Sequence, residues 1–179
     1  MGKAYQMLQA LLRNKVATAA GFGLVILALI LREYFSGGVI THHLLAQEDL
    51  PGISNWWGLF SVTLLALVTL WLVDRRLQQH PETKAGGVFR AFFGALLFGI
   101  AMGLLWEFSL VELLSKAIWL PLLIALFLPV YRPEYLLGFV VGMAYTFGGI
   151  LPIGIGLVLV IGAFLIYHLT RWVHRLLSK

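Results

Sequence analysis

The residues best suited to chemistry gather in one polar stretch that separates two apolar blocks of the sequence. His42 and His43 are adjacent, and Glu48 and Asp49 follow within the same stretch. Imidazole nitrogens and carboxylate oxygens together suit zinc, iron or a proton relay. If residues 41–47 are helical, the two histidines point about 100° apart and cannot readily share one ion. Each would then need a partner from another part of the chain.

Glu107 is the candidate partner. It follows Trp106 and is flanked by apolar residues, with no cation before Lys116. A carboxylate at membrane depth is costly unless it is paired or lines a wet cavity. We therefore take His42, His43 and Glu107 as candidate catalytic residues and as candidate ligands of a divalent metal. The alternative is that the helix ends one turn earlier, which leaves Glu107 in headgroup water.

A second group of residues is suited to holding a substrate. Tyr145 precedes the Gly148-Gly149 turn, and a helix that breaks at membrane depth exposes backbone groups that can line a cleft. Trp56 and Trp57 have an alternative role as anchors, because tryptophan is enriched at membrane boundaries. The candidate substrate-binding residues are Glu48, Asp49, Asn55, Trp56, Trp57, Glu107 and Tyr145.

The composition predicts the elements that must position these residues. Of 179 residues, 60% are hydrophobic and only 12% are charged, whereas a soluble domain has roughly 25% charged and about 45–50% apolar residues. The mean hydropathy is +0.91. Apolar residues come in long unbroken blocks, whereas the strands of a membrane barrel alternate apolar and polar residues. The predicted fold class is therefore an all-α integral membrane protein.

The apolar blocks predict a bundle of six transmembrane helices in a single polytopic domain. The region after Tyr135 is divided into two spans, because Gly148, Gly149 and Pro152 supply residues that break and reverse a helix. An amphipathic segment is expected over 1–15 and an outer loop over 34–55. The expected spans cover residues 16–31, 56–73, 88–106, 117–131, 135–149 and 153–170.

The distribution of charge predicts the orientation. Short cytoplasmic connections collect Lys and Arg, and with six spans every Lys and Arg except Arg32 and Lys116 falls on one side. Both termini should therefore be cytoplasmic, in a membrane of the bacterial inner-membrane type. The net charge of +5 is explained by this orientation and by contact with anionic lipid, and no basic, aromatic-interleaved surface predicts nucleic-acid binding.

Small residues and prolines predict how the helices pack. Gly99 and Gly103, like Gly138 and Gly142, are four residues apart on one helix face, which lets another backbone approach closely. We interpret these pairs as contacts within the chain, with a homodimer seam as the alternative. Pro121 and Pro129 permit kinks in the fourth span, which bundles use for packing and for cavities.

Three classes of function remain open from the sequence. The chain has no cysteine, which excludes thiolate chemistry, and it contains no phosphate-binding loop or standard catalytic motif. We expect a small transporter or channel component that admits a small solute or ion through an outer-facing cleft. The alternatives are a membrane-embedded enzyme acting on a lipid or lipid-soluble substrate, and a non-catalytic subunit or assembly factor. The expected partners are membrane lipids and either further copies of the chain or a partner membrane subunit.

Overall fold

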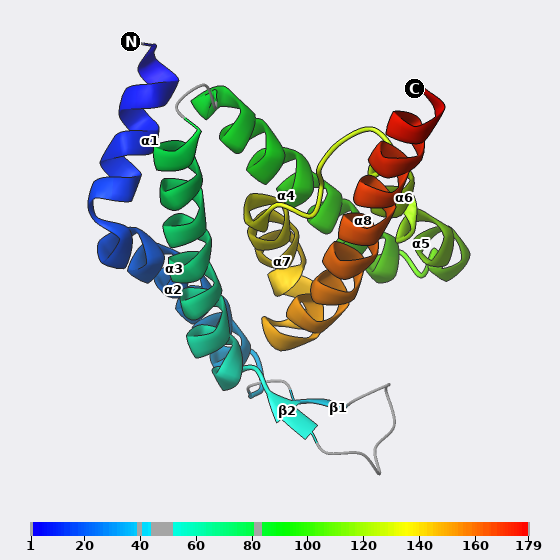
Figure 1. Cartoon of the computed structure of the whole chain (residues 1–179). Helices are drawn as coiled ribbons and strands as arrows, with labels where there is room; N and C mark the ends of the chain where they lie inside the picture. Colours follow the sequence, from blue (N-terminus) through cyan, green and yellow to red (C-terminus); the bar gives the residue numbers. More distant parts are fainter. Residues whose placement is uncertain (1, 39–40, 44–51, 81–83, 179) are drawn as a thin grey trace.

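The computed structural model describes residues 2–38, 41–43, 52–80 and 84–178, with only the backbone for residues 41–43, 52 and 53. Within this part the chain forms helices and one short hairpin (Figure 1). The helices are α1 (Lys3–Arg13), α2 (Lys15–Phe35), α3 (Trp56–Gln79), α4 (Ala85–Glu107), α5 (Val111–Ala117), α6 (Leu120–Ile124), α7 (Pro133–Phe147) and α8 (Ile150–Leu177). The hairpin pairs β1 (Thr41–His43) with β2 (Gly52–Ser54) in antiparallel register.

Four helices in the described part are long and apolar enough to cross a membrane. They are α2, α3, α4 and α8, with 21, 24, 23 and 28 residues. A helix rises 1.5 Å per residue, so about 20 residues cross the roughly 30 Å of bilayer hydrocarbon. These helices indicate a membrane protein, and they cover the predicted spans 16–31, 56–73, 88–106 and 153–170.

The predicted span over 117–131 is not one continuous helix in the structure. The segment holds the end of α5, the five-residue helix α6 and a series of turns. Pro121 lies in the first turn of α6, where a proline without an N–H is tolerated. In a continuing helix its ring would instead clash with the preceding turn. The chain therefore returns along the bundle as short pieces.

The region after Pro133 forms two helices, as the glycines and proline predicted. The first, α7, has 15 residues and ends at Gly148, whose φ of +66° lies in the left-handed region that glycine adopts without strain. The second, α8, begins at Ile150. Most residues of α7 are buried, because α3, α4 and α8 pack around this helix.

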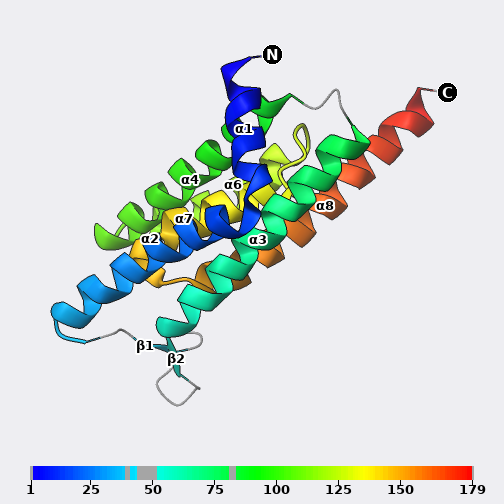
Figure 2. The same cartoon turned by 90° about the vertical axis from the view of Figure 1, so that its left-hand side faces the viewer.

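The long helices run alternately along a common direction (Figures 1 and 2). At one end of the α2–α3 pair, Lys15 and Asp74 form an ion pair of 2.7 Å. At the other end, Asn55 bonds to Glu33. These two contacts show that α2 and α3 are antiparallel. The free ends of α1 and α8 lie at one end of the molecule, and the β-hairpin lies at the other.

The glycines of α4 and α7 lie where these two helices touch. A Cβ added to Gly99 would lie 2.5 Å from the carbonyl oxygen of Phe139, and one added to Gly138 would strike the carbonyl oxygen of Phe92. Gly103 faces the side chain of Thr146, whose Oγ1 would lie 2.7 Å from an added Cβ. Residue numbers at these contacts increase in the same direction along both helices, so α4 and α7 are parallel. Their backbones are in direct contact at Gly99 and Gly138.

The amphipathic segment at the N-terminus is the helix α1. Its apolar residues Leu8 and Leu12 are buried in a cluster with Val73, Ala85 and Val88. The apolar side of α1 is therefore covered by α3 and α4, and only its other side remains for the membrane surface.

Candidate functional site

The histidines of the polar stretch are placed by their backbone alone. His42 lies opposite Ile53 and His43 opposite Gly52 in the hairpin. Residues 41–43 are thus a strand and not the start of a helix. The side chains of both histidines, and the whole of Glu48 and Asp49, lie outside the described residues.

Glu107 is the last residue of α4, and its side chain is exposed. The chain turns immediately after it, through Phe108 and Ser109. Among the residues that the structure describes, no three side chains of His, Asp or Glu are grouped to hold a metal. The position of Glu107 is therefore that of an exposed polar residue at the end of a helix, and not that of a buried carboxylate within a span.

Asn55 is buried, and it joins three elements. Its Nδ2 donates hydrogen bonds to Oε1 and Oε2 of Glu33, at 2.8 and 3.0 Å. Its Oδ1 lies against Gly148 at the turn between α7 and α8. Asn55 thus ties the end of α2 and the start of α3 to this turn.

Tyr145 lies at the same end of the bundle as Asn55. The guanidinium carbon of Arg32 is 4.6 Å from the centre of the Tyr145 ring, a cation–π contact. Arg32 therefore contacts the candidate Tyr145, and the next residue, Glu33, contacts the candidate Asn55. Trp56 and Trp57 are exposed at the start of α3, as expected for residues at a membrane boundary.

An apolar cavity lies elsewhere, among α4, α6, α7 and α8. It has a volume of about 300 Å³, which is at the lower end of the roughly 300–1,000 Å³ typical of small-molecule sites. The candidates from the sequence do not line it. It is lined by Gly94, Ala95, Phe98, Leu120, Pro121, Ile124, Leu128, Val130, Tyr135, Leu136, Phe139, Gly156, Leu159, Val160 and Ala163.

The local sequence explains why this space is not filled. On α4, a Cβ added to Gly94 would meet no atom within 4 Å. On the opposite side, the wall consists of the short helix α6 and the turns after it instead of a continuous helix. The break in the chain at Pro121 therefore leaves this wall of the cavity incomplete. Among the lining residues, Tyr135 alone carries a polar side-chain group.

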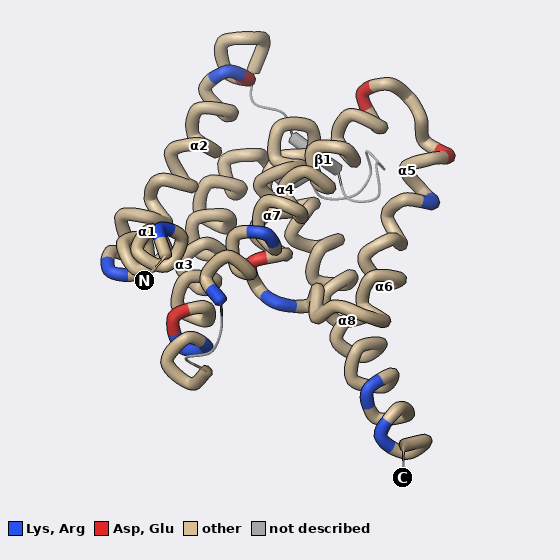
Figure 3. Tube along the Cα trace, turned by 90° about the horizontal axis from the view of Figure 1, so that it is seen from above, with Lys and Arg blue, Asp and Glu red and all other residues tan. Residues whose placement is uncertain are grey.

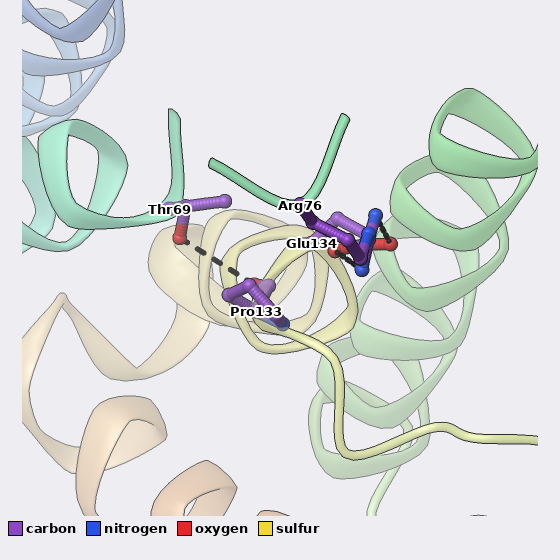
Figure 4. Close-up of polar contacts among 4 residues, drawn as sticks. All are labelled: Thr69, Arg76, Pro133 and Glu134. Atoms are coloured by element: carbon purple, nitrogen blue, oxygen red, sulfur yellow. Dashed lines mark hydrogen bonds and ion pairs between the residues drawn. The ribbon is translucent and has the colours of Figure 1, made fainter. Parts of the chain in front are cut away.

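A buried ion pair lies beside Tyr135 at the start of α7 (Figure 4). Nη2 of Arg76 donates to Oε1 of Glu134 at 2.7 Å, and Nη1 donates to Oε2 at 3.2 Å. The Glu134 side chain is only 3% exposed. Thr69 Oγ1 donates to the carbonyl oxygen of Pro133 at 3.5 Å. These bonds fix the first turn of α7 to α3.

Comparisons with protein-family models, with curated proteins and with solved structures give no match to this chain.

Sequence reasoning missed the cavity and the Arg76–Glu134 pair. One signal was present, since Glu134 is an acidic residue among the cations of the side expected to be cytoplasmic. Pro121 and Pro129 were a second signal, because kinks were expected to serve either packing or cavities.

Proposed function

We propose that this protein is a small membrane transporter or carrier component that binds the apolar part of a lipid-soluble solute, drawn from the bilayer, in the cavity among α4, α6, α7 and α8. The observation that carries this proposal is the lining of the cavity. Its residues are aliphatic, aromatic or glycine, and the Tyr135 hydroxyl is the one polar side-chain group among them. A hydrated ion or a sugar would lose its water there and gain no hydrogen bonds, which costs several kcal/mol per polar group.

The rim of the cavity supports entry from the lipid. Leu120, Ile124 and Leu128 line the cavity and are also 44%, 43% and 52% exposed. Bilayer hydrocarbon is the solvent that accepts such a surface. A solute dissolved in the membrane would reach the cavity sideways, between α6 and the long helices, in place of the outer-facing cleft expected from the sequence.

Binding and movement are better supported than catalysis at this cavity. Its lining residues include no His, Asp, Glu, Lys or Ser, and general acid–base or metal chemistry needs such groups. Tyr135 can orient a ligand through its hydroxyl. The enzyme hypothesis therefore finds no support in the cavity.

The same proposal includes six crossings of a bacterial-type inner membrane, with both termini in the cytoplasm. In it, α5 and α6 together form the fourth crossing and α7 the fifth. The arrangement of charge supports it, because Arg76 near the end of α3 and Glu134 at the start of α7 form one ion pair. The chain must have returned along the bundle between the end of α4 and the start of α7 for that pair to form.

The test uses the variant Gly94→Leu, which places a side chain into the cavity from a position where a Cβ meets nothing within 4 Å. The control is Gly154→Leu on α8, where a Cβ also meets nothing within 4 Å and which does not line the cavity. Native mass spectrometry of the detergent-solubilised protein with dodecanol should show saturable binding of one molecule. Gly94→Leu should abolish this binding and Gly154→Leu should retain it.

Transport is tested in proteoliposomes with a phospholipid that carries a fluorophore on its head and is quenched only from outside. The protein should accelerate its movement between leaflets, and Gly94→Leu should remove that acceleration. A folded protein that neither binds dodecanol nor moves the lipid would overturn the proposal.

A further inference from the structure

We propose that the ligand of this cavity is an anionic amphiphile, with its apolar tail in the cavity and its negative head at Arg132 and Arg90. The proposal rests on the proposed function, because it takes the cavity to be the binding site. It adds the chemistry of the head, which the apolar lining alone does not specify.

The lining itself leads to these two cations. Tyr135 and Val130 line the cavity, and Arg132 lies between them in the sequence. The backbone N–H of Tyr135 donates a hydrogen bond to the carbonyl oxygen of Arg132 at 3.0 Å. One wall of the cavity is therefore continuous with a cationic region at the start of α7.

The face of α4 leads to the same region. Arg90, Gly94 and Phe98 are spaced four residues apart in α4, so they lie on one face of the helix. Gly94 and Phe98 line the cavity. Arg90 is thus one turn beyond the lining, toward the N-terminal end of α4. Lys and Arg positions lie beside α7 in this region, together with an acidic position (Figure 3).

Within the residues that the structure describes, neither Arg90 nor Arg132 forms an ion pair. The ion pairs recorded there are Lys15 with Asp74 and Arg76 with Glu134. Both oxygens of Glu134 are occupied by Arg76. Arg90 uses its Nε in a hydrogen bond to the carbonyl oxygen of Gly86, which leaves its terminal nitrogens for a ligand.

An anionic head suits this region better than a neutral one. Guanidinium groups bind carboxylate or phosphate oxygens in a two-bond geometry, and such charge-assisted bonds are roughly twice as strong as neutral ones. Arg132 is half-buried, so less of this attraction is lost to water than at a fully exposed site. The arrangement suits a ligand that has an acidic head and an apolar tail. The head would lie at Arg90 and Arg132, and the tail would lie in the cavity.

The experiment compares dodecanoic acid with dodecanol by native mass spectrometry, at a pH where the acid is ionised. The two probes share one tail and differ in the charge of the head. The native protein should bind the acid about tenfold more tightly, a difference of about 1.4 kcal/mol. In the double variant Arg90→Gln/Arg132→Gln this preference should disappear, while the affinity for dodecanol stays within about twofold. Arg175→Gln, near the exposed end of α8, is the matched control for loss of one cation and should keep the preference.

The outcomes separate this inference from the proposed function. Binding of both probes with equal affinity, abolished by Gly94→Leu, overturns the inference and leaves the proposed function in place. A preference for the acid that survives the double variant also overturns it. Absence of binding by either probe overturns the proposed function itself.

A further pair of probes identifies the source of the acid. Phosphatidylglycerol that displaces dodecanoic acid, where phosphatidylcholine does not, assigns the head to an acidic phospholipid. Displacement by neither lipid assigns it to a free fatty acid. Displacement by both lipids equally means that the head is not recognised and overturns the inference.

Discussion

Arg76 and Glu134, 58 residues apart in the sequence, form a two-bond ion pair between α3 and the first turn of α7. The carboxylate is 3% exposed and the guanidinium 18% exposed. Glu134 also gains from its place at the N-terminus of α7, where the helix dipole favours a negative charge. The pair fixes the central helix at the edge of the cavity and the cationic region.

Neutralising this pair on one side should destabilise the protein strongly. Glu134→Gln leaves the buried guanidinium without a counter-charge, and breaking a buried pair costs about 3–5 kcal/mol. Nε of Arg76 is already buried without a hydrogen-bond partner, so little remains to compensate. Thermal unfolding in detergent should show a large decrease in Tm. Asp74→Asn is the control, because Lys15 and Asp74 are 28% and 24% exposed, and water that reaches both groups weakens their attraction. Equal decreases in the two variants would contradict this account.

The contact between α4 and α7 should be intolerant of any side chain at its glycines. A Cβ at Gly142 would strike the carbonyl oxygen of Leu96 and lie 2.9 Å from the backbone nitrogen of Ile100. Backbone atoms cannot move aside as a flexible side chain can, so Gly142→Ala should cost at least about 1–3 kcal/mol. Gly94→Ala, in α4 itself, meets nothing within 4 Å and should be neutral or slightly stabilising, because alanine favours helix. The measurement is again Tm in detergent, and a neutral Gly142→Ala would mean that the helices are farther apart than described.

The sequence predicted the features that depend on local chemistry. Long apolar runs without charge predict helices wherever they occur, and a Gly-Gly pair before Pro152 predicts a break on its own. The partner of Glu134 was not predictable, because the pair depends on how α7 lies against α3. The cavity was not predictable for the same reason, since it exists only between four elements. Pro121 belongs partly to each case. Its sequence predicted a kink, but the packing of the neighbouring helices determined whether that kink was filled by side chains or left a cavity.

The turn between α7 and α8 should depend on both Asn55 and Gly148. Gly148 has a φ of +66°, which strains an L side chain, and its Cβ would collide with Oδ1 of Asn55. Gly148→Ala should therefore be destabilising by about 1–3 kcal/mol. Asn55→Ala should be destabilising by about 1–3 kcal/mol, because it removes both bonds to Glu33. Gly154→Ala, where a Cβ meets nothing, is the control. If Gly148→Ala matched this control, the turn would have another conformation.

The number of crossings can be decided with single cysteines, because the native chain contains none. Ser36 and Ser178 are exposed and lie beyond the ends of α2 and α8. Six crossings place Ser36→Cys outside the cell and both Arg132→Cys and Ser178→Cys inside. Four crossings, by α2, α3, α4 and α8 alone, leave residues 108–149 outside, so that Arg132→Cys would be labelled from outside while the other two are unchanged. Arg132→Cys therefore decides between the two topologies.

The ion pair between Arg76 and Glu134 makes the inner location of residue 132 the expected result. Arg76 lies near the end of α3, which both topologies place inside, and it holds Glu134 two residues after Arg132. A membrane-impermeant maleimide added to whole cells should label Ser36→Cys at once. It should label Arg132→Cys and Ser178→Cys only after the membrane is permeabilised. Labelling of Arg132→Cys in intact cells would require Glu134 and Arg76 to lie on opposite sides of the membrane, and both the ion pair and the inner location of the anionic head would then be wrong.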